Sequence, residues 1–498
     1  MAEAPGAPRR QRLLHLDLKT VNSYGDQLLF ELVRQTFNGF GGGAYFDVTE
    51  SHPFRERATA AWVDQVNENF DGVVIGGGGI FPRRFNAAAA SGWQWNITTA
   101  LLARLKKPVI VFGAGNPPDF DADNYKPVFR THVNQTMKQS IFFGLRSTGA
   151  VDAMREYLDD PADAPLVFQP CPTTIGKYLL PGLVGVDHPG ERRLGLQLGL
   201  EKPHIDSGLK PQDIFPRYVR LVKQLEADDW QIDFFAHKNA DFVFFAEHGE
   251  RLGLNPVRLY GTPNVLFTGV HAYAQPTIVL GARGHSQMIP FGAGRIPLSL
   301  STNQKIRFFA HEAGHPEWLV DPWATDMADR AFATVRQADE NRVQLEADIA
   351  TTQQRFVATT KDNLATIYER LTGERVEADL VPYTDLELRL SLAGYVDDLE
   401  RRELRDKLRE LTAKVQGRNG GTVTGAPLVT ATDLLKQAGG AARNGDYGTA
   451  RRLRSAATVL NADLVAAKRT PRWDSGLAHF IPGPVITTAK RARKMIDR

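Results

Sequence analysis

Short apolar runs alternate with helix-like segments through the first 180 residues of the chain. Runs rich in Val, Ile, Leu and Phe predict buried strands, and the amphipathic stretches between them, such as residues 27–37, predict helices. Alternation of this kind indicates βαβ units and a mainly parallel sheet. The predicted strands span residues 13–18, 45–48, 72–75, 109–112 and 141–145.

A second series of the same kind follows residue 190. Its predicted strands span residues 193–198, 230–236, 277–280 and 296–300, with a predicted helix over residues 216–228. The segment PGLVGVDHPG, residues 181–190, is rich in turn-forming Pro and Gly and is predicted to link the two series. The fold class is therefore α/β, with two Rossmann-like domains, 1–180 and 191–325, each built on a parallel sheet. A cleft between two such domains is the expected ligand site.

From about residue 322 the pattern becomes helical. Ala, Glu, Arg, Gln and Leu predominate, and residues 331–371 carry apolar side chains at helical spacing. This stripe predicts either a projecting helical arm or plain packing against the rest of the protein. We expect a long-helix accessory region over residues 326–416, a Gly-rich joint over 417–425, and a last helical segment over 426–498 that ends in a basic tail.

Composition limits the class of protein. The 60 Lys and Arg against 57 Asp and Glu leave a net charge of only +3, which argues against a protein that mainly binds nucleic acid. The single cysteine, Cys171, excludes an internal disulfide and a cysteine-based metal site, and we expect it to be buried. No apolar run is long enough for a signal peptide or a membrane span, so we expect a cytoplasmic protein. The basic residues 490–494 leave peripheral contact with the inner membrane face open, beside the alternative of a solvated helix end.

Four consecutive glycines, Gly76, Gly77, Gly78 and Gly79, follow the predicted strand 72–75. Glycine allows positive φ and a close approach of backbone N–H groups to a ligand, and the carboxyl end of a parallel strand is where such sheets bind anions. Gly113, in VIVFGAG, follows the next predicted strand and extends this rim. The turn therefore predicts a site for a small molecule that carries phosphate. Clean GxGxxG and GxxxxGK[ST] patterns are missing from the sequence, which disfavours nicotinamide chemistry and P-loop hydrolysis.

Charged residues follow other predicted strands. Arg146, in FGLRS, is placed either to bind a phosphate or carboxylate or to form a salt bridge at a domain edge. Asp26, in NSYGD, is either the N-cap of the next helix or a carboxylate that binds or deprotonates a sugar hydroxyl. His237 ends a strand, although a lone histidine of this kind is more often structural.

The segment GARGHSQ carries the sharpest pattern. Arg283 and His285 lie two residues apart just past a predicted strand, so we expect their side chains to point in similar directions. They would supply one permanent cation and one group that titrates near neutral pH. Lys305, after the next predicted strand, would add a second cation.

These motifs together resemble the polysaccharide pyruvyl transferase family. The ordered set is NSYGD, FDGVVIGGGGI, KPVIVFGAG, FGLRS, FFAHKNADFV, ARGHSQMIPFGAG and NQKIRFF, and it covers about residues 13–320. The resemblance implies a two-domain, glycosyltransferase-B-like fold followed by an α-helical C-terminal region for which it supplies no role. It also implies transfer of the enolpyruvyl unit of phosphoenolpyruvate to sugar hydroxyls as a cyclic ketal. Two positions depart from the family pattern, where Ser147 and Gln169 replace acidic residues.

The resemblance also implies roles for individual residues. Arg146, Arg283 and His285 would hold the donor, and His285 suits the general acid that protonates the donor methylene carbon. His285, Arg283 and Asp26 are expected to be catalytic. The residues expected to bind substrate are Gly76, Gly77, Gly78, Gly79, Gly113, Arg146, His237, Ser286 and Lys305. The chemistry requires no metal and no cofactor beyond the donor, and the sequence has no HExxH motif.

Two other functions are compatible with these residues. One is a nucleotide-sugar glycosyltransferase of the same architecture, which would also use glycine turns and arginines against a diphosphate. The other is a noncatalytic scaffold in which a decayed transferase module serves the helical half as an assembly platform. The joint presence of Arg283, His285, the glycine turn and Asp26 favours a working pyruvyltransferase. Its partners would be phosphoenolpyruvate and a polymeric or lipid-linked saccharide acceptor, with homo-oligomerisation left open.

Overall fold

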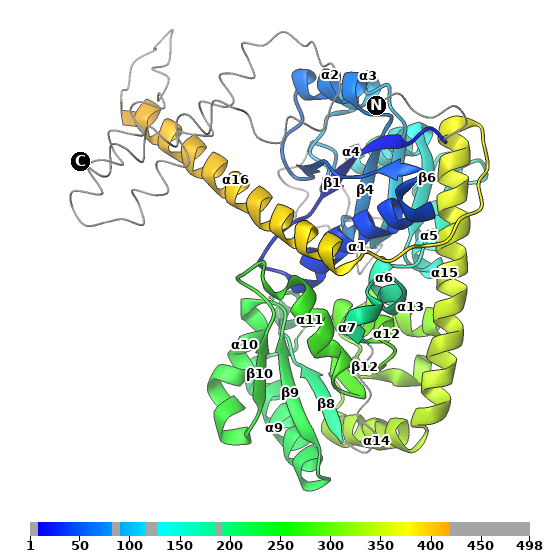
Figure 1. The fold of residues 1–498 in the computed structure, drawn as a ribbon. Coiled ribbons are helices and arrows are strands. Elements are labelled where there is room, and N and C mark those ends of the chain that lie inside the picture. Colours follow the sequence, from blue (N-terminus) through cyan, green and yellow to red (C-terminus); the bar gives the residue numbers. More distant parts are fainter. Residues whose placement is uncertain are drawn as a thin grey trace, which may run out of the picture. The chain divides into compact units, whose positions relative to one another are not determined.

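The computed structural model describes residues 8–81, 90–115, 127–184, 192–200, 202–206 and 208–418 of the chain (Figure 1). The described residues between Pro8 and Gly394 form one compact unit, and the chain from Tyr395 onward belongs to a second unit. Of the second unit, the structure describes only residues 395–418, which continue helix α16 (Asp385–Arg418).

The first sheet is parallel throughout and has the strand order β2-β1-β4-β5-β6-β7, with β3 also paired to β1. Its strands are β1 Gln11–Asp17, β2 Phe46–Asp47, β3 Ser51–Pro53, β4 Gly72–Gly79, β5 Val109–Gly115, β6 Ser140–Leu145 and β7 Leu166–Phe168. The helices of this part are α1 Tyr24–Gly39, α2 Ala60–Asn69, α3 Thr99–Arg104, α4 Pro127–Gln139 and α5 Thr148–Arg155.

The second sheet is also parallel and has the order β10-β9-β8-β11-β12-β13. Its strands are β8 Arg193–Gln197, β9 Gln231–Ala236, β10 Asn255–Arg258, β11 Ile278–Gly281, β12 Ile296–Leu300 and β13 Leu319–Val320. Its helices are α8 Lys202–Asp206, α9 Pro211–Ala227, α10 Phe242–Phe244, α11 Val265–Ala274, α12 His285–Gly292 and α13 Gln304–Ala313. Two short helices, α6 Gly176–Leu179 and α7 Pro181–Val184, precede this sheet.

The fold class predicted from the sequence, two parallel α/β sheets followed by helices, is confirmed. The central strands are buried on both faces, which is why they read as continuous apolar runs; Val73, Val74 and Ile75 of β4 are all at most 1% exposed. The short strands β3, β7, β10 and β13 were not predicted. They have two to four residues, and β3 and β10 contain no fully buried position, so no apolar run marks them.

Helices α14 (Met327–Glu340) and α15 (Arg342–Thr372) belong to the compact unit that contains both sheets. The ring of Phe356 on α15 contacts Phe168 of β7 and Phe291 of α12, with ring centroids 5.8 and 5.9 Å apart. The Gln353 amide donates to the Phe291 carbonyl, and the Asn363 amide donates to the Phe168 carbonyl at 3.0 Å. Helix α15 therefore packs on elements of both sheets (Figure 1).

The chain that follows α15 returns over helix α1. The Gly41 N–H donates to the Asp379 carbonyl at 2.8 Å, and the Val381 N–H donates to the Gly39 carbonyl at 2.9 Å. The expected separate accessory region over residues 326–416 is thus corrected for its part up to residue 394, which is built into the unit that holds the sheets. The apolar stripe on α15 serves packing, because Ile349, Phe356 and Leu364 are each at most 1% exposed.

We expect a chain that ends at Asn341 to lose its cooperative fold. It would lack Ile349, Phe356, Leu364 and Ile367, all buried, and each such side chain contributes roughly 1.5–3 kcal/mol. Their sum is comparable to the whole stability of a typical domain, about 5–15 kcal/mol. Expression and urea unfolding of this truncated chain, beside a chain that ends at Arg418, would measure the effect. A soluble truncated chain with a native unfolding midpoint would show that α15 is dispensable.

Several predicted segments lie wholly or partly outside the described residues. Of the predicted linker 181–190, residues 181–184 form α7 and the remainder is not described. Of the Gly-rich joint 417–425, residues 417 and 418 end α16, while the rest, the segment 426–498 and its basic tail are not described. In the described ranges, no helix is both long enough and apolar enough to cross a membrane.

Candidate functional site

The glycine turn lies at the carboxyl end of β4, where the parallel strands of the first sheet share one edge. Gly77 and Gly78 have φ of 67° and 84°, in the left-handed region that favours glycine. A Cβ on Gly78 would lie 2.8 Å from Leu18 Cδ1, so a side chain there would need both a strained backbone and a shift of Leu18. A Cβ on Gly79 would meet no described atom within 4 Å. The turn is therefore packed at Gly78 and open at Gly79.

The structure gives Gly113 and Gly76 packing roles. Gly113 has φ of 63°, and a Cβ there would lie 3.2 Å from the ring of Pro172. A Cβ on Gly76 would overlap the imidazole of His15. Both residues are buried, so they allow close packing under the glycine turn.

Asp26 is not the N-cap of helix α1. The helix begins at Tyr24 after Ser23, which places Asp26 in the first turn. The carboxylate lies beside the glycine turn, with Oδ1 3.8 Å from the position of a Cβ on Gly78. Within the described part of the chain this side chain makes no hydrogen bond, so its oxygens are available at the rim.

His285 is the first residue of helix α12, and its ring packs against Gly25 of helix α1. A Cβ on Gly25 would overlap that ring, so only glycine lets the two helix starts approach so closely. Burial lowers the pKa of His285 well below its ordinary value, and the charges of Arg146, Lys305 and Lys238 lower it further. The imidazole is therefore neutral at neutral pH in the ligand-free protein.

Arg146 follows β6 and lies across from His285, on the other sheet's side of the site. Its guanidinium carbon Cζ is 2.6 Å from the position of a Cβ on Gly115, so the glycine at the end of β5 makes room for it. The residue is 7% exposed. Among the described residues its guanidinium has no hydrogen-bond or ion-pair partner. A buried cation without a counterion favours binding of an anion.

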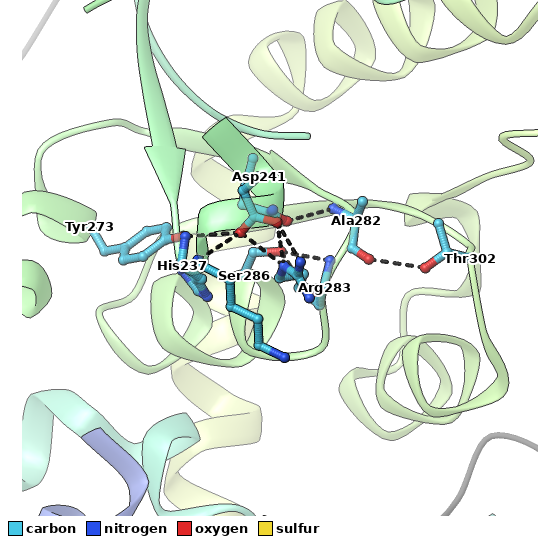
Figure 2. Close-up of polar contacts among 9 residues, drawn as sticks. His237, Asp241, Tyr273, Ala282, Arg283, Ser286 and Thr302 are labelled. Carbon is cyan, nitrogen blue, oxygen red and sulfur yellow. Dashed lines mark hydrogen bonds and ion pairs between the residues drawn. The ribbon is translucent and has the colours of Figure 1, made fainter. Parts of the chain in front are cut away.

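Arg283, in contrast, is neutralised inside the second sheet. Its Nε donates to Asp241 Oδ1 at 2.8 Å and to Oδ2 at 2.9 Å, and Asp241 is completely buried (Figure 2). The same carboxylate accepts the His237 N–H at 2.9 Å. Arg283 and His285 thus have different partners, since Arg283 is held by Asp241 whereas His285 starts helix α12 and packs on Gly25.

His237 and Ser286 also have internal partners. His237 is 2% exposed, and its Nε2 lies 2.6 Å from the Tyr273 hydroxyl (Figure 2). Ser286 is fully buried; its hydroxyl donates to the Arg283 carbonyl at 2.7 Å and accepts the Arg283 N–H at 3.1 Å. Both residues therefore have hydrogen-bond partners within the second domain's own loops and helices.

Lys305 and Lys238 bring further positive charge to His285. The Lys305 stem lies over Gly284, with Cε 3.6 Å from the position of a Cβ there. Lys238 follows His237 at the end of β9, and its charge acts on both His285 and His237. Sequence reasoning missed Lys238, although a lysine directly after a strand-end histidine was a usable signal.

Sequence reasoning also missed Tyr24, which joins the NSYGD motif to the second sheet. Its backbone N–H donates to the His237 carbonyl at 3.2 Å, and its hydroxyl donates to the Leu266 carbonyl at 3.1 Å. Gly269 leaves the space for the Tyr24 ring. These contacts hold the start of α1 against the second sheet's helices and thereby set Gly25 beside His285.

The two departures from the family pattern have structural uses. The Ser147 hydroxyl caps helix α5 by accepting the Ala150 N–H at 3.2 Å. Gln169 is fully buried and uses both ends of its amide, donating to Thr360 Oγ1 at 3.2 Å and accepting from Asn363 at 2.9 Å. A carboxylate at position 169 could not donate to Thr360, so the amide suits the attachment of α15.

His15, which lies beneath the glycine turn, makes stability depend on pH. Burial is the main cause that lowers its pKa from 6.5 to about 4. The unfolded chain therefore binds this proton at a higher pH, and stability falls as pH drops from 6.5 toward 4. A shift of this size corresponds to roughly 3 kcal/mol at pH 4. Urea unfolding at several pH values should show a shallower pH slope for His15→Leu; an unchanged slope would contradict the assignment.

The solved structures that this chain resembles are distant in sequence. S. aureus MnaA, solved with UDP, is 12% identical, covers 76% of this chain and 100% of its own, and superposes with a TM-score of 0.46. A UDP-N-acetylglucosamine 2-epimerase is 14% identical, with 76% and 100% covered and a TM-score of 0.45. The Thermobaculum terrenum O-GlcNAc transferase is 12% identical, with 74% and 70% covered and a TM-score of 0.39. Among curated proteins, no sequence matches this chain.

The family suggested by the motifs is confirmed by a direct match. The family model described as polysaccharide pyruvyl transferase matches residues 24–294, a stretch that begins at Tyr24 and includes the glycine turn, Arg146 and His285. This match spans more than half of the 498 residues. The chain therefore belongs to the polysaccharide pyruvyl transferase family.

Proposed function

We propose that this protein transfers the enolpyruvyl unit of phosphoenolpyruvate to two hydroxyls of a saccharide and forms a pyruvate ketal. The observation that carries the proposal is the buried guanidinium of Arg146, which lacks a partner among the described residues and acts electrostatically on His285. Family membership supports a transferase of this class. The acceptor is a saccharide, either polymeric or lipid-linked.

The donor carries a phosphate and a carboxylate, which match the positive charge around His285. Arg146 offers a planar fork that binds either group with two hydrogen bonds, and Lys305 and Lys238 add point charges from the second sheet. Arg283 is left out of the donor contacts because Asp241 already neutralises it. Its role becomes that of fixing the loop that carries His285.

The donor itself would supply the condition for catalysis. Without it, burial and three cations hold the pKa of His285 low. A bound polyanion offsets those cations and so favours the imidazolium form. Proton transfer from His285 to the donor methylene carbon is then coupled to donor binding, which limits protonation of the empty site.

The steps conserve atoms and charge. His285 gives its proton to the methylene carbon, which becomes a methyl group, and one acceptor hydroxyl attacks the adjacent carbon while Asp26 takes the hydroxyl proton. Phosphate then leaves with the electrons of its C–O bond and takes the proton held by Asp26, which restores the carboxylate. The second hydroxyl closes the ketal, and its proton restores the acid form of His285. Asp26 suits the base because its carboxylate lies beside the glycine turn, near Gly78.

The direct test uses isotopically labelled phosphoenolpyruvate with free and lipid-linked hexosides, and it measures phosphate release and ketal product by mass spectrometry. UDP-sugars in parallel reactions test the alternative of a nucleotide-sugar glycosyltransferase. Ketal product with phosphate release supports the proposal. Glycosyl transfer from a UDP-sugar, or no reaction of the donor with any acceptor in the panel, contradicts it.

The Arg146→Met variant should bind phosphoenolpyruvate roughly 10²-fold more weakly, because two charge-assisted hydrogen bonds are lost. Calorimetric titration of the donor into the variant measures this. Arg104→Met is a matched control, since Arg104 is an exposed arginine that pairs with Asp64 on a neighbouring helix. Wild-type affinity in Arg146→Met would remove Arg146 from the donor site.

A further inference from the structure

The geometry points to Glu312 as a positioning residue. It holds Arg146, which follows the first sheet's β6, and Lys305, on the second sheet's α13, at fixed positions relative to each other. This inference rests on the proposed function, because it concerns the same anion site. Glu312 lies in helix α13 and does not itself contact the site residues named above. Its effect is transmitted through helix α5, which begins directly after Arg146 and Ser147.

One face of helix α13 carries all the relevant side chains. Lys305, Phe308 and Glu312 are spaced i, i+3 and i+7, so they lie in a row along the helix. Lys305 lies over Gly284, next to His285. Phe308 packs on Gly149 of α5, where a Cβ would overlap its ring. The row therefore runs from the catalytic histidine to the helix that follows Arg146.

Glu312, the last residue of this row, makes a polar contact from α13 of the second sheet to α5 of the first. Its Oε1 accepts the Thr148 N–H at 2.8 Å and also accepts the Thr148 hydroxyl. Thr148 is the first residue of α5, so the carboxylate neutralises the positive end of that helix. Glu312 is only 9% exposed, which strengthens such a contact.

The position of Glu312 is itself fixed by a third element. The Arg355 guanidinium of α15 donates to the Glu312 carbonyl at 2.8 Å. Since Thr148 lies two residues after Arg146, displacement of the α5 start would displace the guanidinium as well. The negative charge of Glu312 interacts with the start of α5, and so it does not neutralise the Arg146 guanidinium.

The test compares Glu312→Ala, Glu312→Gln and the control Asp233→Ala. Asp233 is also buried and ion-paired, but its partner Arg193 lies in the same sheet. We expect Glu312→Ala to weaken calorimetric binding of phosphoenolpyruvate about tenfold, as for loss of one charged hydrogen bond. Glu312→Gln keeps an acceptor oxygen and should restore most of the affinity. Asp233→Ala should lower the unfolding midpoint without changing donor affinity.

A second readout is independent of the donor. The charge of Glu312 is not among those that act on His285 in the described part of the chain. A change in the NMR titration of His285, assigned with His285→Gln, would therefore report movement of Arg146 or Lys305, the two cations that Glu312 is inferred to position. We expect the His285 pKa in Glu312→Ala to rise toward its ordinary value.

The outcomes separate the two proposals. Wild-type protein that does not bind phosphoenolpyruvate contradicts the proposed function, whereas the His285 titration still decides the role of Glu312. Glu312→Ala with unchanged donor affinity and an unchanged His285 titration overturns the inference. If Glu312→Ala fails to fold, Thr148→Val removes the hydroxyl half of the same contact; it should then show smaller changes of the same sign, and unchanged values would again overturn the inference.

Discussion

Replacement of His285 by alanine should lower turnover about 10²–10⁴-fold, the usual range for the loss of a general acid–base group. The fold should persist, because the buried His285 Nε2 has no hydrogen-bond partner among the described residues and its removal breaks no bond there. Single-turnover phosphate release measures the chemical step, and calorimetry measures donor binding separately.

His271→Ala is the matched control for this variant. His271 is an exposed histidine on helix α11 and lies outside the site. It should turn over at the wild-type rate. A folded His285→Ala protein that releases phosphate as fast as wild type would exclude His285 from proton transfer, whatever its affinity for the donor.

Gly25→Ala should have an effect of similar size from a single methyl group. The new methyl group would overlap both the imidazole ring and the Cβ of His285. The start of α12 must therefore move away from α1. Catalytic geometry tolerates little displacement, and a misplacement of about 1 Å costs on the order of 10²-fold in rate. Stability should change less, since alanine suits a helix better than glycine does.

Gly182→Ala tests whether this effect is specific. Gly182 also lies in a helix, α7, and a Cβ there would meet no described atom within 4 Å. It should leave both turnover and stability close to wild type. The comparison requires steady-state rates and thermal unfolding for both variants; equal rates in Gly25→Ala and wild type would show that the close contact with His285 has no role in catalysis.

Contacts across the two sheets explain why glycine is needed at position 25. Tyr24 is tied to the carbonyls of His237 and Leu266, so Gly25 cannot move away from α12 without breaking them. The NSYGD motif is therefore a joint as well as a source of Asp26. The sequence of this motif indicates only that a helix begins after the preceding strand.

Local patterns in the sequence determined much of the fold. Every strand predicted from an apolar run is present, because strands covered on both faces need consecutive buried side chains. The glycines at positions 77 and 78 could also be predicted, since positive φ after a strand is a local requirement. Family membership followed from the order of such local motifs.

Only the tertiary structure showed which of two similar side chains has a partner inside the protein. Arg146 and Arg283 both follow strands in similar sequence contexts. Arg283 meets Asp241, a carboxylate 42 residues away in the chain, whereas Arg146 lies over a glycine and meets no carboxylate in the described residues. His237 and His285 differ in the same way. The Nε2 of His237 is hydrogen-bonded to the Tyr273 hydroxyl, whereas the Nε2 of His285 has no hydrogen-bond partner among the described residues.

The role of α15 was likewise beyond local pattern. An apolar stripe such as that of residues 342–372 is equally compatible with a projecting helical arm and with a helix that packs against a core. What decides is the location of Phe168 and Phe291, which the chain brings to the same ring of Phe356 from more than sixty residues away. Sequence periodicity determines which face of an element is apolar, while partners distant in the chain determine what that face covers and which charges near it remain available for a ligand.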